Sequence, residues 1–232
     1  MTIPLSLYGF TGLDAIALAL LLSLSLLIGW VIDHPPKSRM SVSVLMAEYR
    51  REWMRQFVTR QPRIFDANIV DGLRRGTAFF ASACMITLGG GIAVIGNSER
   101  LNSVAADLTL APQGAELEIK LIVVMVFVAS GLLKFIWAHR LFGYCAIMMA
   151  AVPNNPEDPS AYPRAAHAAE INITAARSFN RALRAIYFAL GALGWLFGPE
   201  ILIATTLLTV AVLIRREFAS ASRLVIQQTT KV

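Results

Sequence analysis

Three apolar runs, each about twenty residues long, constrain this chain more than any other feature of its sequence. They extend over residues 13–32, 76–96 and 119–138. An α-helix of that length crosses the roughly 30 Å hydrocarbon core of a bilayer and satisfies its own backbone hydrogen bonds there. Only 16% of the residues are charged, against about 25% in an ordinary soluble domain. We therefore predict an all-α, polytopic membrane protein that forms a single integral membrane domain over residues 1–232.

The first run is predicted to be a retained span rather than a cleaved signal peptide. No Lys or Arg precedes Lys37, whereas a signal peptide starts with a positively charged region. The run ends at residues 30–33 in Trp-Val-Ile-Asp, which lacks the small residues of a cleavage site. It is therefore taken as the first span.

A fourth apolar region lies between Arg184 and Arg215 and is interrupted only by a Gly-Pro-Glu segment at 198–200. As one helix its thirty residues would be about 45 Å long, which exceeds the thickness of the hydrocarbon core. Two helices over 183–198 and 199–216 fit better, because Gly suits the end of one helix and Pro the first turn of the next. We expect five spans, with four as the alternative. The sequence leaves open whether the Gly-Pro-Glu segment is a turn or a kink.

Positively charged residues fall almost entirely on one side of this five-span arrangement. Of the twenty-one Lys and Arg residues, nineteen lie in 33–75, 134–184 and 215–232, and only Arg100 and Lys120 lie on the other side. Basic loops stay in the cytoplasm, so we predict a bacterial inner membrane protein with its N-terminus outside and its C-terminus in the cytoplasm. The net charge of +6 then reflects topology and an attraction to anionic membrane lipids, and nucleic acid is not expected as a partner.

The predicted cytoplasmic segments have helical patterns of their own. Residues 40–58 mix apolar and basic side chains at helical spacing, and residues 141–152 continue the third span or lie along the interface. Four prolines between 153 and 163 then break the chain, and a long helix is expected from Arg164 into the fourth span.

Four basic residues near the inner ends of the spans are candidate contacts for an anion or a lipid headgroup. Lys134 and Arg140 lie at the end of the third span, and an ionisable residue at membrane depth is a candidate functional residue. Arg177 and Arg184 share one helix face before the fourth span. The alternative for all four is that they anchor the helices, because long basic side chains reach the headgroups from inside the bilayer.

Glycines in two of the spans are candidates for close helix packing or a bend. Gly89, Gly90 and Gly91 lie inside an apolar run with no Lys-Ser or Lys-Thr after them, so they do not form a phosphate-binding loop. Gly194 and Gly198 have the GxxxG spacing that lets two helices approach closely.

No arrangement of residues indicates catalysis, a metal or a cofactor. His34, His139 and His167 stand in unrelated contexts, and a di-iron motif would place Glu before His, whereas Glu170 follows His167. No nucleophile and base occur in a recognisable pattern. We therefore predict no catalytic residue, no metal site, no cofactor and no enzymatic activity.

Several motifs together resemble the domain of unknown function 599 family of membrane proteins, which occurs in bacteria and plants. They are Tyr49-Arg50-Arg51-Glu52-Trp53-Met54, Arg60-Gln61-Pro62-Arg63-Ile64-Phe65-Asp66, the Lys-Phe-x-Trp-x-x-Arg element from Lys134 to Arg140, Asn180-Arg181-Ala182-Leu183-Arg184 and the Trp-x-x-Gly-Pro element from Trp195 to Pro199. The resemblance covers about residues 10–215 and departs from the family pattern at 138–142, which includes His139. It implies a membrane protein and supplies no activity.

Two functional hypotheses follow for a non-enzymatic membrane protein. An oligomeric channel or permeation protein would pack through its glycines and place its basic residues at the inner mouth. A structural or accessory subunit of a larger membrane complex would dock on a membrane-protein partner instead of forming a homo-oligomer. An enzyme acting on lipid-linked substrates has the least support.

Overall fold

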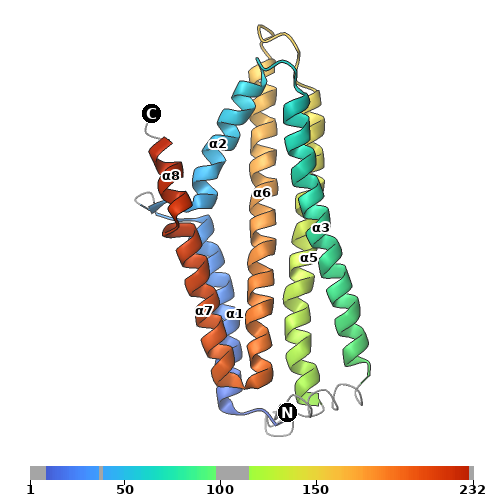
Figure 1. Ribbon diagram of the computed structural model, residues 1–232, viewed down its shortest axis with the longest axis vertical. Coiled ribbons are helices and arrows are strands. Elements are labelled where there is room, and N and C mark those ends of the chain that lie inside the picture. Colours follow the sequence, from blue (N-terminus) through green and yellow to red (C-terminus); the bar gives the residue numbers. More distant parts are fainter. Residues whose placement is uncertain (1–8, 37–38, 98–114, 230–232) are drawn as a thin grey trace, which may run out of the picture. The chain divides into compact units, whose positions relative to one another are not determined.

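The computed structural model describes residues 9–36, 39–97 and 115–229, and within them the chain is helical, without strands (Figure 1). Its elements are α1 (Gly12–Asp33), α2 (Val42–Phe57), α3 (Ile64–Ile95), α5 (Ala115–Ala150), α6 (Ala161–Ala192), the 3₁₀ helix η3 (Leu193–Phe197), α7 (Pro199–Phe218) and α8 (Ala221–Thr229). The predicted all-α class is confirmed.

Three of these helices, α1, α3 and α5, are long and apolar enough to cross a membrane. Large apolar side chains on them face outward: Leu26 is 77% exposed, Ile86 76% and Val126 61%. Such exposure suits hydrocarbon as the surrounding solvent, because a soluble protein rarely presents extended apolar faces to water. The composition of these helices therefore agrees with a polytopic membrane protein.

The Gly-Pro-Glu segment is a turn and not a kink within one helix. Gly198 ends η3 with φ of 120°, a left-handed conformation that favours glycine, and Pro199 is the first residue of α7. After the turn α7 runs back along the chain that precedes it, since the Thr205 hydroxyl donates to the carbonyl of Gly191 at 2.7 Å. Gly194 lies against the same threonine.

Several helices outside or beyond the predicted spans are present. The expected helix over 40–58 is α2, whose first turn is capped by the Ser41 hydroxyl accepting from the amide of Val44 at 3.3 Å. The helix expected from Arg164 is α6. Two helices are longer than the apolar runs on them, because α3 already begins at Ile64 and α5 continues to Ala150.

The chain divides into two compact units, each built from three separate segments. Unit 1 combines 1–31, 83–131 and 183–215, and unit 2 combines 32–82, 132–182 and 216–232. Unit 1 contains most of the apolar runs, whereas unit 2 contains α2, α8, the charged start of α3 and most of the Lys and Arg residues.

A buried polar cluster joins three segments of unit 1. The carboxylate of Asp14 accepts from the indole N–H of Trp195 and from the Thr11 hydroxyl, both at 2.7 Å. Lys120 pairs with Glu116 at 2.6 Å, and its ammonium lies 5.8 Å from the centre of the Trp195 ring. Asp14 and Lys120 are both buried. Since a buried charge is costly unless it is matched, the start of α1, the start of α5 and η3 are held together by these contacts.

The close approach at Gly194 generates a test of the hairpin. A Cβ atom there would lie 2.9 Å from Thr205 Cγ2 and 3.1 Å from the Ile201 carbonyl oxygen. Gly194→Ala must therefore displace α7, and we expect it to lower the stability of the purified protein by about 1–3 kcal/mol in thermal unfolding. Gly89→Ala is the matched control, because its Cβ would meet open space, and it should be neutral or stabilising by up to about 1 kcal/mol. Equal effects of the two changes would contradict the packing described here.

Candidate functional site

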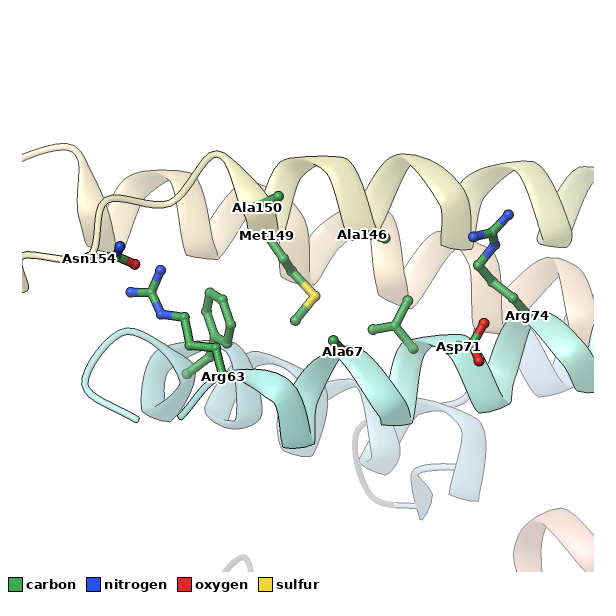
Figure 2. A pocket seen from close by; sticks show the side chains of 10 residues that line it. Arg63, Ala67, Asp71, Arg74, Ala146, Met149, Ala150 and Asn154 are labelled. Carbon is green, nitrogen blue, oxygen red and sulfur yellow. The ribbon is translucent and has the colours of Figure 1, made fainter. Parts of the chain in front are cut away.

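A groove of about 420 Å³ lies in unit 2 between the charged start of α3 and the last turns of α5. Figure 2 shows its side chains, with Arg63 and Asn154 at one end and Asp71 and Arg74 at the other. The apolar residues that line it are Phe57, Ala67, Val70, Ala146, Met149 and Ala150. We call this feature the α3–α5 groove.

The α3 side of the groove is one face of a helix. Ala67, Val70, Asp71 and Arg74 recur at the three- and four-residue spacing that places side chains above one another. Arg63 immediately precedes the first residue of α3. Two arginines therefore border one apolar strip at a separation of about 16 Å along the helix, from the rise of 1.5 Å per residue.

The guanidinium of Arg63 is bound by neutral groups only. Its Nη atoms donate to the carbonyls of Val152 and Pro153 at 2.8 Å and of Val58 at 3.1 Å, where α5 and α2 have just ended. It also lies 4.6 Å from the centre of the Phe57 ring. These contacts satisfy exposed helix-end carbonyls, but they leave the positive charge of Arg63 without an opposite charge.

Arg74 has still fewer partners. Its Nε is buried and has no hydrogen-bond partner within residues 9–36, 39–97 and 115–229. Asp71, the carboxylate nearest in sequence, pairs with Arg75 at 2.8 Å instead. The Nε of Arg74 lies over Gly143 of α5, 4.0 Å from where a Cβ of that glycine would be. Each end of the groove thus carries a guanidinium whose charge no described carboxylate balances.

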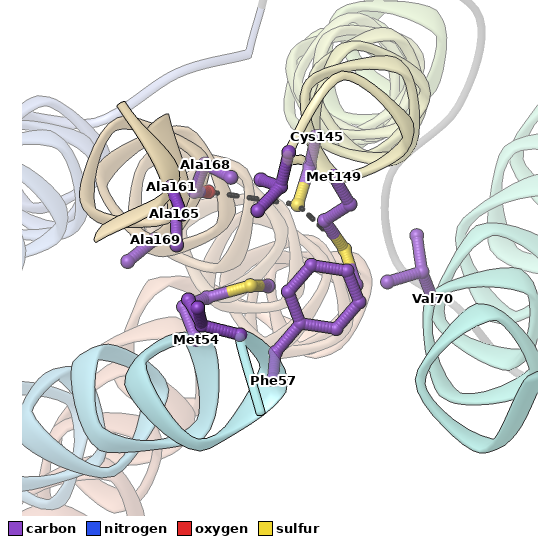
Figure 3. Packing of buried hydrophobic residues seen from close by; sticks show 11 residues of the cluster. Met54, Phe57, Val70, Cys145, Met149, Ala161, Ala165, Ala168 and Ala169 are labelled. Carbon is purple, nitrogen blue, oxygen red and sulfur yellow. Dashed lines mark hydrogen bonds between the residues drawn. The ribbon is translucent and has the colours of Figure 1, made fainter. Parts of the chain in front are cut away.

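The floor of the groove is part of the apolar core of unit 2, shown in Figure 3. Met54 and Phe57 of α2 meet Met149 of α5 there, and four alanines of α6 close the cluster: Ala161, Ala165, Ala168 and Ala169. The small side chains of α6 let the helices approach closely. The thiol of Cys145 donates to the carbonyl of Ala168 at 3.5 Å within this core.

A buried carboxylate fixes the turn that leads into α3. Asp66 is completely buried and accepts from the indole N–H of Trp53 at 2.6 Å. It also forms an ion pair with Arg60. Because Trp53 belongs to α2 and Asp66 to the first turn of α3, these bonds set the position of the groove face.

A second set of polar contacts joins α2 to α6. The guanidinium of Arg50 bonds to the Asn172 side chain, whose amide donates to Cys145 Sγ at 3.4 Å. Burial lowers the pKa of Arg50 from its ordinary value. Arg51 pairs with Glu170 at 2.7 Å. The two polar motifs at 49–54 and 60–66 thus contribute much of the polar framework of unit 2.

The four basic residues proposed as anion contacts do not form one cluster. Arg140 is exposed on α5 and donates to the Tyr144 hydroxyl at 2.8 Å. Lys134 is half-buried on the same helix. Arg177 of α6 lines a different pocket to which neither of them contributes. Arg184 is buried and belongs to unit 1, whereas the other three belong to unit 2.

The candidate glycines also have different surroundings. A Cβ on Gly89 or Gly90 would meet open space, so these two make no close helix contact within the described part of the chain. Gly91 faces the side chain of Met125. Gly194 and Gly198 serve the hairpin of η3 and α7.

Sequence reasoning did not identify Arg63 and Arg74. Both fall in the segment 33–75, whose charges indicate a cytoplasmic region with one helix at 40–58. The signal that was available is the three- and four-residue spacing of Ala67, Val70 and Arg74, which extends the helical pattern of 76–96 toward the N-terminus.

Potential metal ligands do not gather in the described residues, which contain no group of three or more His, Cys, Asp and Glu side chains. Of the pair His167 and Glu170 on α6, the glutamate bonds to Arg51.

The buried carboxylate of Asp66 gives a test of how the groove is held. Asp66→Asn removes the charge that matches Arg60, and we expect a loss of about 3 kcal/mol in the free energy of unfolding. Asp71→Asn is the control, since the side chains of the Asp71–Arg75 pair are 53% and 75% exposed and such a pair contributes less than about 1 kcal/mol. Thermal or denaturant unfolding in detergent measures both, and a loss no larger for Asp66→Asn would refute its role.

A family model described as a protein of unknown function, DUF599, matches residues 16–222. This match confirms the resemblance inferred from the motifs. No curated protein and no solved structure matches the chain. The chain belongs to the DUF599 family.

Proposed function

We propose that this DUF599 protein is a non-enzymatic integral membrane protein that binds an anion with an apolar body in the α3–α5 groove. The observation that carries the proposal is the pair of guanidinium groups, Arg63 and Arg74, at the two ends of an apolar strip. Neither is matched by a described carboxylate, so an anionic ligand would supply the missing negative charge.

The membrane placement that we propose has five spans. The apolar parts of α1, α3 and α5 supply three, and the hairpin supplies the others over 183–198 and 199–216. The outward apolar faces of the three long helices and the turn at Gly198 support it. The basic residues of unit 2 then lie in the cytoplasm, with the N-terminus outside and the C-terminus inside.

The size of the α3–α5 groove and the side chains that line it indicate which class of ligand it would bind. Its volume of about 420 Å³ lies in the range of small-molecule sites, which combine an apolar lining with a few polar groups. A guanidinium presents a planar fork of donors that suits carboxylate or phosphate. Arg63 already uses its Nη atoms on backbone carbonyls, so Arg74 is the side chain that would bind the anionic group. The ligand's apolar body would lie against Val70 and Met149.

Binding of decanoate tests this proposal. We expect the purified protein to bind decanoate more tightly than acetate, which lacks the apolar body, or decyltrimethylammonium, which has the opposite charge. Arg74→Gln should weaken decanoate binding at least about tenfold, since a hydrogen bond to a charged group contributes about 1.5–3 kcal/mol.

The matched control is the neighbouring Arg75→Gln. Arg75 is mostly exposed and pairs with Asp71 without lining the groove, so its loss should leave the affinity unchanged. Isothermal titration at constant salt measures all three ligands. Equal weakening by the two substitutions would show a general charge effect, and the groove would then not be the site.

The orientation has a separate test. A reporter that is active only in the cytoplasm, fused after Val232, should be active if the hairpin of α7 crosses the membrane. Activity of a periplasmic reporter at the same position would leave four spans and place the basic tail outside.

A further inference from the structure

A second pocket of about 240 Å³ lies in unit 2 where the start of α2, the middle of α6 and the end of α7 meet. Its polar lining is Ser43, Arg50, Arg177, Asn180 and Glu217. Apolar side chains from α2 and α6 complete it. We call it the α2–α6 pocket. It shares no lining residue with the α3–α5 groove.

Two opposite charges border this pocket without forming an ion pair with each other. Arg177 is exposed on α6, and Glu217 is half-buried at the end of α7. Neither forms an ion pair with any residue that the structure describes. A cation and an anion that face one cavity in this way are complementary to a ligand that carries both signs of charge.

The carboxylate of Glu217 is held in place by neutral donors. The Ser43 amide donates to its Oε2 at 3.1 Å, and the Ser43 hydroxyl lies 3.0 Å from both carboxylate oxygens. Asn180 in turn donates to the Ser43 hydroxyl at 3.2 Å. A carboxylate has about four acceptor positions, so Glu217 keeps capacity for further donors from a ligand.

Two arginines, Arg50 of α2 and Arg177 of α6, supply the positive charge of the pocket. Arg50 also lines the pocket, but its guanidinium already bonds to Asn172. Arg177 forms no hydrogen bond or ion pair with a described residue: the charge of Arg177 helps to lower the pKa of the nearby Glu170, but that carboxylate is hydrogen-bonded to Arg51. Arg177 is therefore the side chain able to take an anionic group, with Arg50 adding positive potential behind it.

The pocket lies at the ends of apolar runs. Glu217 follows Arg215 and Arg216, which end the apolar run of α7 at Ile214, and Asn180 comes just before the predicted fourth span. If the spans lie in the membrane as proposed above, these residues stand at the level of the lipid headgroups on the basic side. This step depends on the proposed topology but not on the ligand of the α3–α5 groove.

We infer that the α2–α6 pocket binds the headgroup of phosphatidylethanolamine, which carries a phosphate, a primary ammonium and no further charge. Arg177 binds the phosphate, and Glu217 accepts hydrogen bonds from the ammonium. The volume is below the usual range for a whole drug-sized ligand, which suits a headgroup whose acyl chains stay in the bilayer.

The same chemistry separates this lipid from its relatives. The quaternary ammonium of phosphatidylcholine has no N–H to donate to Glu217. Phosphatidylglycerol has no cation at all, and its headgroup leaves the carboxylate without a positive partner. The pocket therefore predicts a preference that a merely basic membrane surface would not show, since such a surface would favour the anionic lipid.

Thermal unfolding of the full-length protein in mild detergent tests the inference. Dihexanoyl forms of the three lipids are added at equal concentration, with glycerophosphoethanolamine as the free headgroup. Phosphatidylethanolamine should raise the unfolding midpoint most, because a ligand that binds only the folded state stabilises it. An equal shift from phosphatidylcholine, or an equal shift from glycerophosphoethanolamine, would overturn the assignment to this lipid.

Two substitutions test whether the lipid preference arises at the α2–α6 pocket. Glu217→Gln should abolish the preference for phosphatidylethanolamine over phosphatidylcholine, and Arg177→Gln should weaken the apparent affinity for phosphatidylethanolamine about tenfold. The controls are Glu52→Gln and Arg55→Gln, which form an exposed pair on α2 and do not line the pocket. If Glu217→Gln still preferred phosphatidylethanolamine over phosphatidylcholine, the inference would be wrong.

The Glu217→Gln substitution also weakens the hydrogen bonds from Ser43, and this change alone could destabilise the fold. A second measurement therefore uses the unchanged protein. Native mass spectrometry with an equimolar mixture of phosphatidylethanolamine and phosphatidylcholine should show an excess of bound phosphatidylethanolamine. Arg177→Gln removes a side chain that forms no hydrogen bond or ion pair with a described residue, and it should lose most of that bound lipid. Equal binding of the two lipids to the unchanged protein would contradict the inference.

Discussion

The arrangement of unit 2 depends on the match between the buried carboxylate of Asp66 and its partners Trp53 and Arg60. An unmatched carboxylate in this position would be costly, so the turn between α2 and α3 has to bring all three together. Because Asp66 belongs to the first turn of α3, the helix begins at Ile64, well before its apolar run. The additional turns carry Ala67, Val70 and Arg74, which form one wall of the α3–α5 groove.

The sequence predicts those parts of the structure that depend on residues close together in the chain. Apolar runs predict membrane helices, a Gly-Pro step predicts the break at 198–199, and mixed helical spacing predicts α2. The early start of α3 was missed because it depends on contacts between residues on two helices, which no window of sequence displays. For the same reason Arg63 and Arg74 were not recognised: the residues that they contact, Gly143 of α5 and Val152 just after it, lie far along the chain.

The family motifs acquire a physical meaning in the structure. Residues 49–54 and 60–66 provide Arg50, Trp53 and Asp66, whose partners hold α2 against α3 and α6. The Trp-x-x-Gly-Pro element provides the indole that binds Asp14 and the turn into α7. The channel and accessory-subunit hypotheses remain predictions, and both are compatible with the ligand proposed for the α3–α5 groove.

The bond between Trp195 and Asp14 has a consequence for synthesis. The two residues are 181 positions apart, so the first helix leaves the ribosome long before its partner exists. Until η3 is made, the carboxylate at the start of α1 has hydrogen bonds from Thr11 and the charge of Lys120, but it lacks the indole N–H of Trp195. The first helix is therefore secured only near the end of translation. A nascent chain that stops before Trp195 would lack the hydrogen bond that joins the start of α1 to η3.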